Sequence, residues 1–125
     1  MTPYVPQVLP AERFVSLRGY RHRTLHWGPE GQTTFFLLHG FQDCVDTFQM
    51  LIDALPRTWR FVGLDWRGFG GSEWQNSPYW FPDYLADLDT LLELMAPNSA
   101  VNLIGHSMGG NVANLYAGIR PERVA

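Results

Sequence analysis

The sequence predicts an α/β fold with a mostly parallel, doubly wound sheet and helices on both faces. Short, nearly continuous apolar runs alternate with segments whose apolar residues recur at helical spacing. Apolar runs of this kind are typical of parallel strands covered on both faces, and strands alternating with helices indicate right-handed crossovers. In addition, a glycine-rich segment, Gly105–Gly110, lies between a strand-like and a helix-like run. That order indicates a turn from a strand directly into a helix.

Five strands are expected, in two groups. Phe14–Gly19 and Arg23–Trp27 mix polar and apolar residues around a short turn, which suits a hairpin at the edge of the sheet. The other three are the continuous apolar runs expected of buried parallel strands. They are Thr34–Leu38, Trp59–Leu64 and Val101–Ile104.

The first expected helix lies between the strands that end at Leu38 and begin at Trp59. Its apolar residues recur at i, i+3, i+4 and i+7, and they are Phe48, Leu51, Ile52 and Leu55. Asp46 is the expected N-cap, Gln49 would complete a capping box, and Pro56 ends the helix.

The second and third helices are also predicted from apolar residues at helical spacing. The second begins at about Asp83, with an apolar stripe formed by Leu85, Leu88, Leu92 and Met95. Its acidic residues Asp87, Asp89 and Glu93 are expected to point away from the core. The third spans Asn111–Ile119, and Glu122–Ala125 then resembles the start of a further strand. The expected fold is therefore truncated after the third helix.

Composition limits the classes of function. The 125 residues are 46% hydrophobic, enough for one domain with a substantial core. A net charge of −3 without any run of Lys or Arg argues against nucleic acid or an anionic membrane as a partner. The single cysteine, Cys44, favours a reducing, cytoplasmic location. No signal peptide, membrane-spanning run or metal-ligand spacing is found, so neither a metal nor a membrane is expected.

The segment Gly105–Gly109 has the pattern Gly-x-Ser-x-Gly. In this pattern a sharp turn strains the serine backbone and exposes its hydroxyl. A serine hydroxyl becomes a good nucleophile when a base removes its proton. Ser107 is therefore a candidate nucleophile, and the alternative is that it only caps the helix that follows.

Two further motifs stand at matching positions. Phe35–Phe41 is a buried strand that runs into a His-Gly turn, and Asp65–Ser72 closes the next strand with a glycine-rich loop. Together with Gly105–Gly110, these segments resemble the N-terminal half of an α/β-hydrolase. The resemblance spans about Ser16 to Ala125 and implies that residues 1–125 form the N-terminal portion of a single α/β-hydrolase domain.

The resemblance implies a serine-dependent, cofactor-free hydrolase that acts through an acyl-enzyme on a small carboxylic ester or related acyl bond. Ser107 would attack, and the backbone N–H groups of Phe41 and Met108 would form the oxyanion hole. In the family an acid and then a histidine follow the serine, but no histidine follows Ser107 in this chain. The chain is thus expected to hold the nucleophile and oxyanion hole and to lack the catalytic acid and histidine.

Several alternatives stay open. Serine at the elbow argues against the dehalogenase and epoxide-hydrolase branches, which resemble this fold but use aspartate there. Esterase, lipase, thioesterase, lactonase and carbon-carbon bond hydrolase branches remain, and an acyltransferase would use the same machinery. A non-catalytic or truncated member acting as a binding module is the alternative from another class. These motifs do not define the substrate, the lid or the oligomeric state.

Other residues with reactive or binding side chains are expected to be structural. None of the four histidines, His22, His26, His39 and His106, is expected to reach the serine as a base. Asp65 and Arg67 are expected to fix the loop beside the site. Cys44 is expected to act as a small apolar residue. The aromatic residues between Trp66 and Phe81 either line an acyl pocket or cover the sheet.

Overall fold

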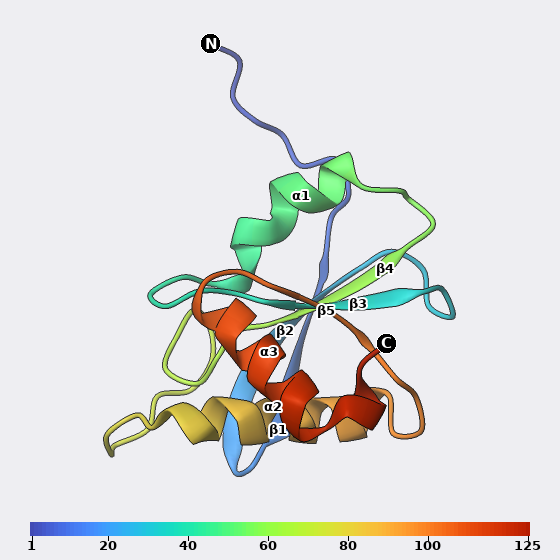
Figure 1. Ribbon diagram of the computed structural model, residues 1–125. Helices are drawn as coiled ribbons and strands as arrows, with labels where there is room; N and C mark the ends of the chain where they lie inside the picture. The colour runs from blue at the N-terminus through green and yellow to red at the C-terminus, as the bar shows by residue number, and fades with distance from the viewer.

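The computed structural model describes residues 1–125 and contains one five-stranded sheet with helices on both faces (Figure 1). The spatial order of the strands is β1-β2-β4-β3-β5. Their bounds are Ala11–Leu17 for β1, Tyr20–Trp27 for β2, Thr34–Leu38 for β3, Arg60–Leu64 for β4 and Asn102–Gly105 for β5. All five expected strands are present; β3 has the expected bounds, and the ends of the others differ from the expected ones by at most three residues.

The sheet is mixed, and its functional half is parallel. β3 lies between β4 and β5 and runs parallel to both. β2 runs antiparallel to β1, to which a tight turn with positive φ at Arg18 and Gly19 joins it directly, and it also runs antiparallel to β4. The carboxyl ends of the three parallel strands therefore lie along one edge of the sheet, where ligands of open α/β sheets bind.

The helices cover the two faces unequally. α1, Gln49–Ala54, extends a short 3₁₀ turn, Val45–Phe48, and lies on one face. α2, Phe81–Met95, and α3, Met108–Ile119, lie on the other face (Figure 1). The predicted α/β architecture with helices on both faces is thus confirmed.

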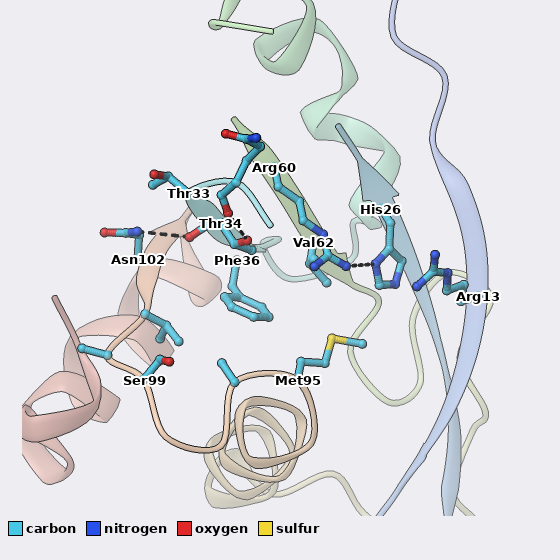
Figure 2. A pocket seen from close by; sticks show the side chains of 14 residues that line it. Arg13, His26, Thr33, Thr34, Phe36, Arg60, Val62, Met95, Ser99 and Asn102 are labelled. Carbon is cyan, nitrogen blue, oxygen red and sulfur yellow. Dashed lines mark hydrogen bonds between the residues drawn. The ribbon is translucent and has the colours of Figure 1, made fainter. Parts of the chain in front are cut away.

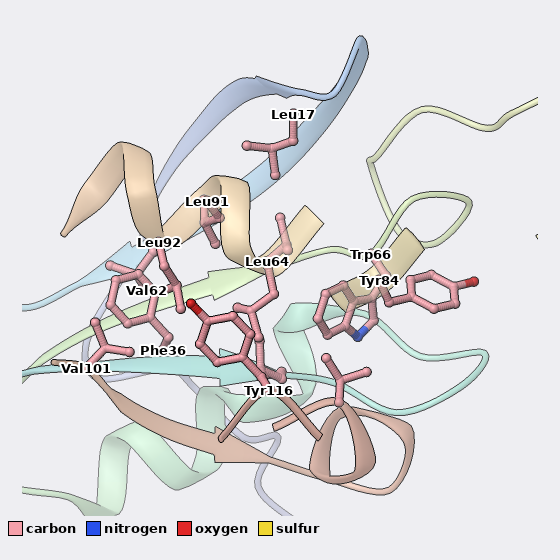
Figure 3. Packing of buried hydrophobic residues seen from close by; sticks show 13 residues of the cluster. Leu17, Phe36, Val62, Leu64, Trp66, Tyr84, Leu91, Leu92, Val101 and Tyr116 are labelled. Carbon is pink, nitrogen blue, oxygen red and sulfur yellow. The ribbon is translucent and has the colours of Figure 1, made fainter. Parts of the chain in front are cut away.

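The alternation along β3 shows why the four residues that follow Thr34 are all apolar. Phe36 and Leu38 belong to a core of 13 buried residues beneath α2 and α3 (Figure 3), while Leu37 belongs to a second core of seven residues beneath α1. In Figure 3, Tyr116 of α3 and Leu92 of α2 pack against Phe36 and Val62 of the sheet. Successive side chains of a strand point to opposite faces, so a strand buried on both faces carries no polar position.

The predicted capping box of the first helix is wrong. Asp46 lies inside the 3₁₀ turn, and its carboxylate accepts hydrogen bonds from Arg23 at 2.7 and 3.2 Å. Gln49 is the first residue of α1, and its side chain accepts from the Trp27 indole and donates to Val8 O. The two side chains are used to tie the helix to β2 and to the N-terminal segment, so no cap is formed.

The prediction that Asp87 points away from the core is also wrong. Asp87 is fully buried on α2, where it accepts hydrogen bonds from Arg67 Nε and Nη2, both at 2.6 Å. His22 Nε2 lies 3.3 Å from the same carboxylate. Burial raises the pKa of Asp87, but the hydrogen bonds of His22 and Arg67 outweigh it and leave this pKa below its usual value. A buried carboxylate with these partners stays ionised.

The last residues of the chain continue the sheet. After the 3₁₀ turn Pro121–Arg123, Val124 forms a parallel bridge with Val101, just before β5. Ala125 N–H donates to Val101 O at 2.9 Å. This agrees with the predicted start of another strand. None of the helices combines the length and the apolar character that crossing a membrane requires.

Candidate active site

Ser107 occupies a strained turn between β5 and α3. Its backbone angles are φ 53° and ψ −118°, outside the regions that non-glycine residues usually adopt. The flanking glycines make the turn possible. A Cβ on Gly109 would lie 2.0 Å from Leu38 O, and one on Gly105 would lie 2.4 Å from Gly109 O. Only glycine fits at these two positions.

The Ser107 side chain is exposed and free. Ser107 stands at the N-cap position of α3, but it forms no side-chain cap hydrogen bond. N-cap residues normally have extended backbone angles and accept a hydrogen bond from the first turn of the helix. The capping alternative therefore does not describe this serine, and its hydroxyl is available for another role.

The turn that follows β3 lies directly beside Ser107. Leu38 is paired with Gly105 in the parallel register, and the next residue, His106, donates its N–H to Leu38 O at 3.0 Å. A Cβ on Gly40 would stand 3.2 Å from the Ser107 Cβ. The structure thus brings the predicted oxyanion turn and the predicted nucleophile together.

Two backbone N–H groups beside this serine have no protein acceptor. Neither Phe41 N–H nor Met108 N–H donates to another backbone group. Met108 is the first residue of α3, and the first N–H groups of a helix lack intrahelical partners and favour negative charge. Unpaired donors next to an exposed hydroxyl are the arrangement that stabilises an oxyanion.

His39 fixes the direction of one of these donors. His39 Nε2 accepts a hydrogen bond from Trp66 N–H at 3.0 Å, so the ring proton is on Nδ1, which donates to Gly40 O at 2.7 Å. The C=O of Gly40 and the N–H of Phe41 belong to one trans peptide and point in opposite directions. Holding the carbonyl therefore aims the Phe41 N–H. Burial lowers the pKa of His39, which keeps this neutral tautomer near neutral pH.

The loop after β4 packs against the turn that follows β3. Asp65 is buried and accepts hydrogen bonds from Val45 N–H at 2.7 Å and from Gly71 N–H at 2.9 Å. Phe69 of the same loop meets the His39 ring at 5.8 Å and the Phe41 ring at 5.6 Å between centroids. Asp65 thus has the structural role that the sequence predicts. Arg67 attaches the loop to α2 through Asp87.

The remaining reactive side chains do not complete a catalytic set. His22 and His26 are buried on β2, and His106 is exposed but forms no hydrogen bond with Ser107. No group of three or more His, Cys, Asp or Glu residues could hold a metal ion. Burial raises the pKa of the Cys44 thiol, which makes it a poor nucleophile.

The aromatic residues after β4 differ in how far they are buried. Trp66 is fully buried and packs against Tyr84 of α2 at 5.6 Å, so it covers the sheet. Trp74 and Trp80 are 73% and 68% exposed. Phe41, at 64% exposed, stands next to Phe69 at the same edge as Ser107. Phe41 thus places an exposed aromatic ring in the turn beside Ser107, with Phe69 packed against it.

Comparisons with known proteins agree with this geometry. Residues 33–125 match the family described as the alpha/beta hydrolase fold. A serine hydrolase-like protein of Danio rerio is 40% identical over 100 residues, which cover 78% of this chain and 30% of that protein. The crystal structure of a bacterial membrane phospholipase A superposes with a TM-score of 0.84 at 28% identity, over 92% of this chain and 37% of that one.

Epoxide hydrolase A from Mycobacterium thermoresistibile also superposes, with a TM-score of 0.79 and 31% identity over 93% of this chain and 37% of that one. The chain thus spans about a third of the length of the proteins it resembles. The matched segment contains the turn after β3, the loop after β4 and the strained serine. With a family match over residues 33–125, the chain belongs to the α/β-hydrolase fold family.

Proposed function

We propose that the full-length protein is a serine hydrolase that cleaves a small carboxylic ester, or a related acyl bond, through an acyl-enzyme. The observation that carries this proposal is Ser107, whose strained backbone exposes an uncapped hydroxyl beside two unpaired N–H groups. Storing strain in this way is common at catalytic centres. A serine that only ended a strand would need neither the strain nor the donors.

The chemistry follows from the geometry. Ser107 Oγ attacks the acyl carbon, and its proton passes to a histidine supplied by the part of the protein outside these 125 residues. The carbonyl oxygen gains negative charge and accepts hydrogen bonds from Phe41 N–H and Met108 N–H. The alcohol leaves with the proton, and water then cleaves the acyl ester on Ser107, restoring the hydroxyl and releasing a carboxylic acid.

The same residue argues against epoxide hydrolysis, although an epoxide hydrolase is among the similar structures. A carboxylate that opens an epoxide forms an ester, which water can cleave. Ser107 would instead form an ether, which has no acyl carbon for water to attack, so the enzyme would stop after one turnover. An acyl bond is the substrate that allows Ser107 to be regenerated.

A fluorophosphonate probe tests the proposal. This reagent forms a phosphonyl ester with a serine that is activated by a base and whose developing oxyanion is stabilised. We expect the full-length protein to be labelled at Ser107 and the heat-denatured protein to remain unlabelled. Peptide mapping by mass spectrometry identifies the site. Absence of labelling, or labelling at a different serine such as Ser72, would contradict the proposed nucleophile.

Replacing His39 tests how the oxyanion hole is oriented. In His39→Leu the Gly40 carbonyl loses its donor, so the Phe41 N–H is no longer held toward the substrate. Removing one oxyanion donor lowers kcat about 10²–10³-fold, and misaiming one should cost about 10- to 100-fold in kcat with KM little changed.

His39→Asn is the matched variant, because its side-chain amide can occupy the position of Nδ1 and donate to Gly40 O. It should recover part of the lost kcat while still lacking the acceptor for Trp66 N–H. Steady-state kinetics of both variants, measured below their melting temperatures, give the comparison. If His39→Asn and His39→Leu lowered kcat equally, His39 would act only through packing and not through its hydrogen bond to Gly40 O.

A further inference from the structure

The largest cavity in the chain lies far from Ser107, at the amino ends of the parallel strands (Figure 2). Its volume is about 470 Å³, within the range of small-molecule sites, which is about 300–1,000 Å³. The first residues of the three parallel strands, Thr34, Arg60 and Asn102, line it, whereas Ser107 follows the last residue of β5. The two sites lie at opposite ends of the parallel strands.

The lining combines two arginines with an apolar floor. Arg13 of β1 and Arg60 of β4 are the charged residues among the 14 that line the cavity, and no carboxylate is among them. Phe36 projects from the sheet toward Met95 and the loop at Ser99 (Figure 2). The cavity therefore offers positive charge at one side and apolar surface at the other.

His26 holds Arg60 in place. Thr24 Oγ1 donates to Arg13 O and lies 2.9 Å from His26 Nε2, so Nε2 carries the ring proton and Nδ1 is free to accept. His26 Nδ1 lies 3.4 Å from Arg60 Nη2 (Figure 2). Burial, together with the charges of Arg13 and Arg60, lowers the pKa of His26 to about 4, so the ring adds no charge near neutral pH.

A carboxylate of the protein already stands between the two guanidiniums. Glu30 Oε1 lies 3.5 Å from Arg13 Nη2 and 3.9 Å from Arg60 Nη2. The Glu30 side chain is 71% exposed and comes from the loop between β2 and β3, so these contacts are long, solvated and weak. The position of Glu30 shows that a carboxylate can lie between the two arginines. Because its contacts are weak, another carboxylate can displace it at a small cost in free energy.

We propose that this cavity binds a small organic carboxylate, whose carboxyl group replaces Glu30 between Arg13 and Arg60 and whose hydrocarbon part packs on the half-buried Met95 and Ala96. Guanidinium groups bind carboxylates with strong, directional hydrogen bonds. The apolar floor selects against inorganic anions, which have no hydrocarbon part to bury. This site does not depend on Ser107 and carries no catalytic step.

Isothermal titration calorimetry of the full-length protein with hexanoate tests the site. Ser107 is first blocked with the fluorophosphonate, whose phosphonyl group occupies the active site, so that hexanoate bound there as a reaction product does not contribute. Hexanoate should bind, while hexanamide of the same length and inorganic phosphate should not. Binding of phosphate without hexanoate, or no binding of any probe, would overturn the proposal.

Three variants locate the binding. Arg60→Gln should weaken hexanoate binding about tenfold or more, because a hydrogen bond to a charged group is lost. Glu30→Gln should strengthen it about two- to fivefold, because the competing carboxylate is gone. Arg57→Gln removes an arginine whose side chain binds Gln7 away from the cavity, and it should change nothing. Binding that is equally insensitive to all three variants would place hexanoate elsewhere and refute the proposal.

Discussion

Ser107→Ala is expected to lower kcat for ester hydrolysis about a million-fold in the full-length protein, as removal of the nucleophile does in a working triad. The Ser107 hydroxyl is exposed and forms no cap hydrogen bond, so its removal leaves no buried group unsatisfied. KM and the melting temperature should therefore stay close to those of the wild type. The variant should thus lose the chemical step and keep its fold and its substrate binding.

Hydrolysis of a p-nitrophenyl ester, with thermal melting on the same samples, measures both effects. Ser99→Ala is the matched control, because Ser99 stands in the exposed loop before β5, at the opposite end of that strand from Ser107. It should retain wild-type kcat. If Ser107→Ala kept more than a few per cent of the activity, the acyl-enzyme proposal would be wrong.

The features that local sequence patterns control were predicted well. After its first residue each parallel strand is apolar on both faces, and each helix carries an apolar stripe, so β3, β4, β5 and the helices follow from periodicity. The elbow is also local, because Gly105 and Gly109 must lack side chains for the turn to form. Ser107 could therefore be predicted to be strained before its φ and ψ were known.

The features that depend on distant partners could not be predicted in this way. Asp46 and Gln49 match a capping box, but Arg23 and Trp27 of the neighbouring strand bind their side chains. Asp87 matches a solvent-facing position, but a buried guanidinium lies opposite it. The sequence pattern of one helix does not show which charged side chains of another segment will pack against it. For His39, the one signal was its place before glycine at the end of a buried strand.

The buried ion pair between Asp87 and Arg67 gives the largest expected effect on stability. Asp87→Asn leaves Arg67, 3% exposed, without the carboxylate that accepts its two 2.6 Å hydrogen bonds, and removing one member of a buried ion pair costs about 3–5 kcal/mol. A domain is stable by only about 5–15 kcal/mol, so this is a large share. Asp83→Asn is the matched control on the same helix. Asp83 pairs with Arg18 at 3.0 Å nearer the surface and comes only within 3.9 Å of Arg67, so this variant should cost less than about 1 kcal/mol.

The pH dependence separates this ion pair from mere packing. Because the pKa of Asp87 is lower in the folded protein, its stabilisation is complete above the unfolded value of about 3.9 and is lost as the pH falls through the folded pKa. The free energy of unfolding should therefore differ most between wild type and Asp87→Asn at pH 7, and the difference should shrink below about pH 4. Urea unfolding at both pH values measures it. A difference that stays constant with pH would mean that the variant loses shape complementarity and not the charge that binds Arg67.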